Sequence, residues 1–158
     1  MHLERSQSLY HRLTVGAAGL IYDRVDGQPV CVRLYLPGDV LASLKESDGL
    51  YQFTPATLEP ANQEQYVTSL SVQLERAAEL AYIRSMPIQR QLPLLVELLS
   101  PIVEDGHLPL THLTFGLIAG RHRETMTHAL LKRSSDRPQR QRHQSIPVRE
   151  LIHTVLKS

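Results

Sequence analysis

The sequence predicts an α+β protein in which a β-rich first part precedes a helical second part. Three observations predict it: β-prone runs fill the first 60 residues, a helical rhythm begins at about Pro60, and two short helical segments meet at Gly120. A chain of 158 residues is long enough for one medium domain or two small ones. We expect three units, at residues 1–60, 61–86 and 87–158.

The first strands are predicted from β-prone runs bounded by turn residues. The runs lie at residues 13–15, 19–22 and 30–36, and turn signals separate them at residues 26–29 and 37–39. The single cysteine, Cys31, lies inside the third run, where a core position is expected rather than a nucleophile.

A long helix is predicted after Pro60 because apolar residues recur at alternating spacings of three and four. These residues are Val67, Leu70, Leu74, Ala77 and Ala81. Such a seam packs either against the protein's own β part or against a second copy of the same helix, and the spacing leaves both open. Residues 88–103 predict a second, strongly apolar helix, with Pro87 between the two.

Two short helices joined by a tight turn are predicted between residues 111 and 132. Thr111 is a good N-cap, and Gly120 suits the left-handed position that ends a helix. The residues expected to face inward are Phe115, Ile118, Ala119, Met126, Ala129 and Leu130. This arrangement is a helix-turn-helix, whose second helix normally places its first turn in the major groove of DNA.

Side chains that can read base edges are expected on or near the open face of the second helix. They are Arg121, Arg123, Glu124, Thr127 and His128. Arginine can bond both acceptors of guanine, and glutamate can accept from the cytosine amino group. Pairing between residues four apart on a solvated helix would explain part of the same pattern.

The charge of the chain is unevenly distributed. Residues 1–110 hold eight Lys or Arg and 13 Asp or Glu, a balance of −5, whereas residues 111–158 hold nine and three, a balance of +6. The asymmetry indicates a polyanion-binding part joined to an acidic body, or a solvated basic tail. Residues 133–144 form a basic loop or arm in which Arg137, Arg140 and Arg142 would contact phosphates.

Several protein classes are excluded by the composition. No apolar run approaches the ~20 residues that a membrane span needs, and the lone cysteine allows no internal disulfide, which together indicate the cytoplasm. The eight histidines lack zinc-ligand spacing. With no glycine-rich phosphate loop and no catalytic constellation, we expect no metal, no cofactor and no enzymatic activity.

Residues 111–127 resemble the helix-turn-helix signature of the Crp/Fnr family of bacterial regulators. The core pattern Gly-x-x-Arg-Glu-Thr is met by Gly120, Arg123, Glu124 and Thr125. Upstream, Asp26-Gly27 and the Pro-Gly-Asp turn within residues 36–41 are similar to the late strands of the family's β-roll. The resemblance covers most of residues 15–133.

The resemblance implies a shortened β-roll, sensor-like, at residues 1–60, a dimerisation helix at 61–86 and a winged-helix-like DNA-binding domain at 87–158. It adds Thr111, His112 and Thr125 to the residues expected to contact DNA, and it favours a homodimer paired along the 67–81 seam. Double-stranded DNA and a second copy of the chain are the implied partners, with RNA polymerase or another regulator protein as a further candidate.

The sequence also departs from the family pattern. The family's β-roll usually has about twice the β-sequence found here. The stretch after Asp39, residues 40–44, lacks the Gly-Glu and the later Arg-Ser/Ala that hold a cyclic nucleotide in the family. The hydrophobic wing is replaced by residues 133–144, and residues 146–156 predict an extra amphipathic helix. Two hypotheses remain: a sequence-specific transcription regulator independent of cyclic nucleotides, or a degenerate family member acting as a protein-interaction module.

Overall fold

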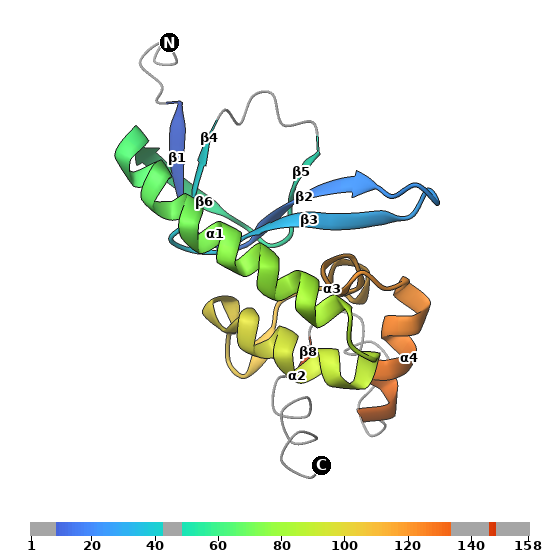
Figure 1. The fold of residues 1–158 in the computed structure, drawn as a ribbon. Coiled ribbons are helices and arrows are strands. Elements are labelled where there is room, and N and C mark those ends of the chain that lie inside the picture. Colours follow the sequence, from blue (N-terminus) through green and yellow to red (C-terminus); the bar gives the residue numbers. More distant parts are fainter. Residues whose placement is uncertain (1–8, 43–48, 134–145, 148–158) are drawn as a thin grey trace.

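The computed structural model describes residues 9–42, 49–133 and 146–147. A β part and a helical part lie on opposite sides of one long helix (Figure 1). The strands of the β part are β1 Tyr10–Val15, β2 Ala18–Asp23, β3 Pro29–Tyr35, β4 Val40–Ala42, β5 Leu50–Gln52 and β6 Thr57–Ala61. The later elements are α1 Gln63–Arg84, α2 Ile88–Leu98, the 3-10 turn η3 Ser100–Ile102, β7 His107–Leu108, α3 His112–Ala119, α4 Arg123–Arg133 and β8 Ile146–Pro147.

The β part consists of two antiparallel three-stranded sheets, in the orders β4-β1-β6 and β3-β2-β5. The predicted runs at residues 13–15, 19–22 and 30–36 all lie in strands or directly at their ends. Between β1 and β2 the chain turns at Gly16, whose φ is +90° and where an added Cβ would lie 2.3 Å from the carbonyl oxygen of Pro55. Only glycine fits this close approach. A small apolar cluster fills the part, with Leu13, Ala18, Tyr35 and Leu41 buried.

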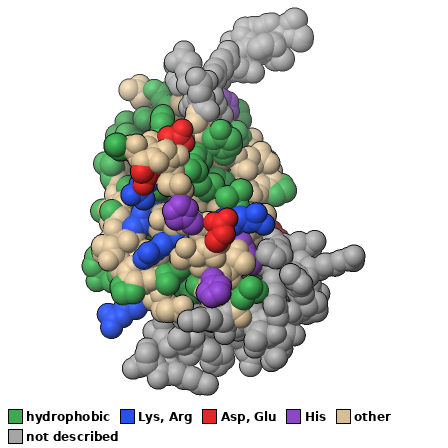
Figure 2. Space-filling view, turned by 90° about the vertical axis from the view of Figure 1, so that its right-hand side faces the viewer, with side chains coloured by type: hydrophobic (Ala, Val, Ile, Leu, Met, Phe, Trp, Pro, Cys, Tyr) green, Lys and Arg blue, Asp and Glu red, His purple; other side chains and the backbone are tan. Residues whose placement is uncertain are grey.

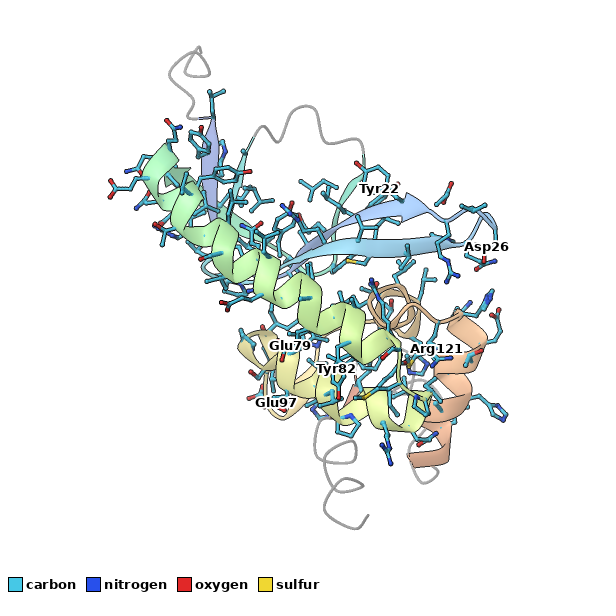
Figure 3. The ribbon with its side chains drawn as sticks, in the orientation of Figure 1. Tyr22, Asp26, Glu79, Tyr82, Glu97 and Arg121 are labelled. Atoms are coloured by element: carbon cyan, nitrogen blue, oxygen red, sulfur yellow. The ribbon has the colours of Figure 1, made fainter. Side chains whose placement is uncertain are left out.

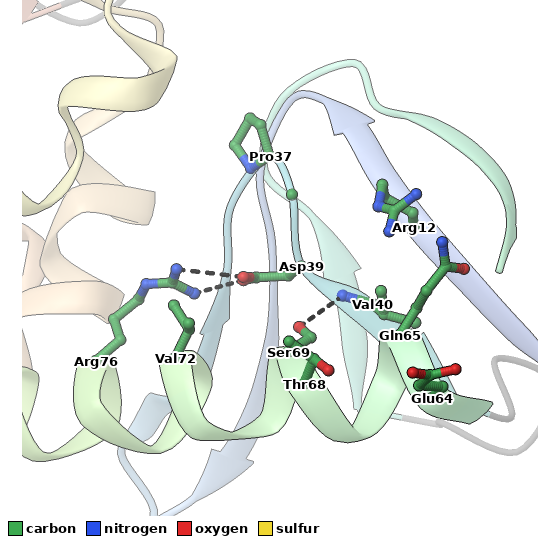
Figure 4. A pocket seen from close by; sticks show the side chains of 11 residues that line it. Arg12, Pro37, Asp39, Val40, Glu64, Gln65, Thr68, Ser69, Val72 and Arg76 are labelled. Atoms are coloured by element: carbon green, nitrogen blue, oxygen red, sulfur yellow. Dashed lines mark hydrogen bonds and ion pairs between the residues drawn. The ribbon is translucent and has the colours of Figure 1, made fainter. Parts of the chain in front are cut away.

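Helix α1 begins at a capping box, in which Asn62 and Gln65 bond each other's backbone N–H groups. The inward face of its first half is polar and bonds strand β4. Ser69 Oγ accepts from Val40 N at 2.9 Å (Figure 4). Gln73 Nε2 donates to Val40 O at 2.9 Å. These two side chains therefore bond the backbone N–H and C=O groups on the outer edge of β4, which the sheet leaves unpaired.

One turn further along α1, Arg76 reaches the other sheet. Its guanidinium donates to Leu34 O of β3 at 3.1 Å and forms a buried ion pair with Asp39, shown in Figure 4. Asp39 also accepts from Leu36 N at 2.8 Å and thereby closes the turn after β3. Helix α1 thus bonds the edge strands of both sheets.

The residues of the predicted seam lie outside the polar inward face of α1. Val67 and Leu74 are each 58% exposed, Ala81 is exposed, and Leu70 and Ala77 are half-buried. Tyr82, near the end of the same helix, is also exposed, at 63%. Within this chain the seam therefore has no apolar partner layer among the described residues.

The second helix is shorter than predicted. The sequence predicts one helix over residues 88–103, but α2 ends at Leu98 and a 3-10 turn follows. The physical reason is Pro101, which has no N–H to donate to Glu97 and disfavours helical backbone at Ser100.

The predicted extra helix at residues 146–156 is wrong at its start. Ile146 and Pro147 form strand β8, which pairs antiparallel with β7 in the register Leu108 with Ile146. Ile146 is buried in the main core beside Leu108, so a strand partner decides its conformation. Residues 148–156 lie outside the described residues, as do residues 134–144 of the predicted basic arm. The first residue of that arm, Arg133, is instead the last residue of α4.

One hydrophobic cluster contains residues from all three expected units. It joins the β part, the long helix and the helix pair through residues such as Cys31, Leu34, Leu80, Ile83, Leu95, Phe115, Ile118 and Met126. The helical part is therefore packed against strand β3 and is not tethered by a free linker.

The Asp39–Arg76 pair gives a stability prediction. Asp39→Ala leaves the buried Arg76 guanidinium without its carboxylate and should lower the free energy of unfolding by about 3–5 kcal/mol in urea denaturation. Glu59→Ala is the matched control, because it removes an exposed pair with Arg12 whose N–O separation is 3.5 Å. That control should cost about 0–1 kcal/mol. Equal losses in both variants would contradict the role given to Asp39.

Candidate nucleic-acid interface

The turn between α3 and α4 is built as the sequence predicts. Thr111 caps α3 by accepting from Thr114 N at 3.1 Å, and Gly120 ends the helix with a φ of +72°. Gly116 allows the turn to approach, because an added Cβ there would lie 2.9 Å from the carbonyl oxygen of Arg121. Both glycines are therefore required by the backbone, and α4 follows directly.

Helix α4 is divided into an inner and an outer side. Met126, Ala129 and Leu130 are buried, as predicted. The exposed residues on the outer side are Arg123, Glu124, Thr125 and His128. The face of the molecule on the α4 side shows basic and histidine side chains gathered together with a few acidic ones (Figure 2). The first turn of α4 is thus free to meet a ligand.

Arg121 does not lie on the open face. It is half-buried, its Nε donates to Gln91 Oε1 at 3.2 Å, and its Nη2 donates to Met86 O at 2.8 Å. In Figure 3 its side chain points back toward the start of α2. Arg121 therefore fixes the turn before α4 against α2.

His112 and Thr127 also lie away from the open surface. His112 is only 3% exposed, and its Nδ1 is 3.1 Å from Thr127 Oγ1, which is half-buried. The pair joins the first turn of α3 to the middle of α4. Thr111 is exposed, but its hydroxyl is engaged as the cap of α3. The arm residues Arg137, Arg140 and Arg142 lie outside the described residues.

A cleft of about 430 Å³ adjoins the exposed face of α4. Its walls come from the start of α2 and the outer side of α4: Ile88, Gln89, Glu124, Thr125, His128 and Ala129. A ligand lying along α4 would therefore also meet the beginning of α2.

Sequence reasoning missed Arg84, the last residue of α1. Its Nε donates to Ile118 O at 2.9 Å, and its Nη2 donates to Cys31 O, so one side chain bonds both α3 and β3. Burial lowers the pKa of Arg84 below its ordinary value. The only signal in the sequence is a basic residue in the last turn of a long helix, which is common.

Cys31 is a core residue, as expected. Its thiol is fully buried and lies 3.3 Å from Arg33 O, to which it donates. Burial raises the pKa of Cys31 to about 11, so the thiol stays protonated at neutral pH.

Among the described residues, no group of three or more His, Cys, Asp or Glu could hold a metal ion. No described helix is long and apolar enough to cross a membrane.

No protein-family model and no curated protein sequence matches the chain. Solved structures do match. A CRP-family transcriptional regulator from Thermus thermophilus aligns with a TM-score of 0.68 at 16% identity, over 91% of this chain and 86% of its own. A second regulator from that organism, of the CRP/FNR family, aligns with a TM-score of 0.66 at 19% identity, over 92% of this chain and 88% of its own.

A putative Crp/Fnr-family regulator from Eubacterium rectale gives a TM-score of 0.65 at 14% identity, over 98% of this chain and 83% of its own. The fold is the Crp/Fnr fold. At these identities the likeness concerns the fold alone. The comparison confirms the predicted α+β class and the Crp/Fnr fold that the resemblance in residues 111–127 implies.

Proposed function

We propose that the chain is a sequence-specific DNA-binding transcription regulator that works as a homodimer. The observation that carries the proposal is the exposed first turn of α4, where Arg123, Glu124 and Thr125 face solvent while the inner side of the helix is buried in the core. In helix-turn-helix proteins this turn meets base edges in the major groove. The structurally similar proteins from Thermus thermophilus are described as transcriptional regulators, which supports the proposal.

Base reading is assigned to the exposed residues and positioning to the buried ones. Arg123 suits a guanine and Glu124 a cytosine amino group, with Thr125 and His128 continuing the surface along α4. The arm residues Arg137, Arg140 and Arg142 would follow phosphates. Of the residues first expected to touch DNA, Arg121, His112 and Thr127 are proposed to act by holding α4 in place.

The exposed seam supports the dimer. An apolar stripe that its own β part does not cover is typical of an interface. We propose that Val67, Leu70, Leu74, Ala77 and Ala81 pair with the same residues of a second copy. The alanines at the later positions would let the two helices approach closely.

The dimer is tested by Leu74→Glu. Burying one leucine contributes about 1.5–3 kcal/mol, and a symmetric seam uses both copies. The change should therefore weaken dimerisation roughly 100-fold or more, measured by sedimentation equilibrium at micromolar concentration. Val25→Glu is the matched control, since Val25 is fully exposed in the turn between β2 and β3. A wild-type protein that sediments as a monomer would refute the seam.

We further propose that the regulator does not depend on a cyclic nucleotide. A cleft of about 410 Å³ lies between the first half of α1 and the turn after β3, and Figure 4 shows its lining residues. The guanidinium at its α1 side, that of Arg76, is already bonded to Asp39 and Leu34. A nucleotide phosphate would have to break these bonds, and residues 40–44, after the Pro-Gly-Asp turn, contain neither the family's Gly-Glu nor its Arg-Ser/Ala.

Titration calorimetry of the wild type with cyclic AMP and with cyclic GMP should therefore give no saturable heat. Titration of the same sample with its preferred DNA duplex provides the control that the protein is active. A saturable heat with either nucleotide would show that the chain retains a nucleotide site.

The alternative is a protein-interaction module that no longer reads DNA. Exposed apolar residues on the sheets favour it, among them Val15 at the end of β1 and Leu58 in β6, which are 54% and 41% exposed. For a regulator, the same surfaces would suit RNA polymerase or another regulator protein. A regulator of this kind would act in the cytoplasm, and we propose no enzymatic activity.

The two functions differ in their response to two arginine variants. Arg123→Ala should cost about 1–3 kcal/mol on the preferred duplex and relax the sequence preference, because this side chain faces base edges. Arg142→Ala, in the arm, should weaken binding to every sequence alike and lower the salt slope by about one. Gel-shift titrations at two salt concentrations, on a duplex selected from a random pool and on a scrambled one, measure both effects.

A scrambled duplex that binds as well as the selected one would favour the interaction module. So would identical behaviour of the two variants, since it would mean that Arg123 adds only charge.

A further inference from the structure

We infer that Arg84 is the positioning residue that fixes the orientation of the helix-turn-helix relative to strand β3 and helix α1. The inference rests on the proposed function, because it concerns how α4 is held for DNA. No DNA contact is assigned to Arg84 itself.

The contacts of Arg84 join three elements through one side chain. The backbone belongs to the last turn of α1, and the guanidinium lies between the last turn of α3 and the edge strand β3. Nε donates to Ile118 O at 2.9 Å and Nη2 to Cys31 O, with a longer contact of 3.5 Å to Leu117 O. These acceptors lie 34, 53 and 33 residues away along the chain.

The partners of this half-buried cation are backbone carbonyls. Within the described part of the chain, no ion pair joins Arg84 to a carboxylate. The carbonyls of Leu117 and Ile118 belong to the end of α3, where a helix leaves acceptors unpaired and favours positive charge. Burying a guanidinium is costly, so its planar donors must keep these acceptors in place. The carbonyls of Leu117 and Ile118 move only if α3 moves.

The stem of Arg84 adds a steric constraint at the turn. An added Cβ on Gly120 would lie 3.3 Å from Arg84 Cδ, so the stem packs directly on the residue that ends α3. Arg123, the first residue of α4, follows three positions later. The turn that orients α4 is thus held between the side chain of Arg84 and the Arg121 bonds to Gln91 and Met86.

Arg76 provides a matched comparison on the same helix. It also donates to a β3 carbonyl, that of Leu34, but its other partner is Asp39 in the β part. Arg76 therefore joins α1 to β3 by bonds that do not include α3. A positioning role for Arg84 predicts that weakening Arg84 changes the orientation of α4, whereas weakening Arg76 does not.

The experiment measures the distance from the β part to α4 by pulsed electron paramagnetic resonance. Cysteines that replace exposed Tyr22 in β2 and exposed His128 in α4 carry spin labels. Cys31 stays unlabelled because it is buried and its thiol pKa is about 11. Labelled protein is diluted with unlabelled protein, so that each measured pair lies within one protomer.

The otherwise wild-type protein and Arg76→Lys should give one narrow distance distribution. Arg84→Met keeps the stem and removes the donors, and it should broaden the distribution and shift its mean. Arg84→Lys should do the same to a smaller degree, because one ammonium cannot replace a planar fork that bonds two elements. If the Arg84→Met variant no longer melts cooperatively, the distance distribution of the Arg84→Lys variant alone tests the inference. A narrow, unshifted distribution in the folded variant would overturn the inference.

DNA binding provides the second readout. A dimer reads two half-sites at a fixed spacing, so orientation affects full sites and not single half-sites. Arg84→Lys should bind a half-site as the wild type does but lose discrimination between full sites that differ by one inserted base pair. Unchanged discrimination would overturn the inference. A wild type without sequence preference would refute the proposed function, while the distance measurement would still decide the role of Arg84.

Discussion

The hydrogen bonds from helix α1 to the edge strands are the interactions on which the rest of the structure depends. An edge strand presents unpaired N–H and C=O groups, and covering them with apolar side chains would leave them unsatisfied. Ser69, Gln73 and Arg76 supply the missing partners. The side of α1 that faces the sheets in its first half is therefore polar, which places Val67 and Leu74 outside. The bonds that attach the helix thus also create its exposed seam.

The second half of α1 follows a different rule. Leu80 and Ile83 are buried in the main core, and Arg84 extends the inward face to the end of the helix. One continuous helix thus bonds both sheets, contributes to the core and reaches α3. Because packed cores and hydrogen-bonded ends deform little, the position of α4 depends on the last turns of α1. The seam and the exposed face of α4 are consequently joined through one packed core.

Local patterns allowed much of the fold to be predicted. Thr111 and Gly120 marked the ends of α3 correctly, because caps depend on a few neighbouring residues. Which side of α1 faces inward was not predictable, since the partners of Ser69 and Gln73 lie 29 and 33 residues away. For the same reason, periodicity suggested a helix at Ile146, although this residue pairs with Leu108 of β7 and lies in a strand.

The candidate site shows the same limit at closer range. Arg121 and Arg123 are two positions apart and chemically identical, yet Gln91 and Met86 engage the first, whereas the second stays exposed. His112 belongs to the signature segment and is nevertheless buried against Thr127. Side chains already fixed by hydrogen bonds lose no further entropy when a ligand binds. An interface built in this way needs few exposed residues, because the buried ones hold the helix that presents them.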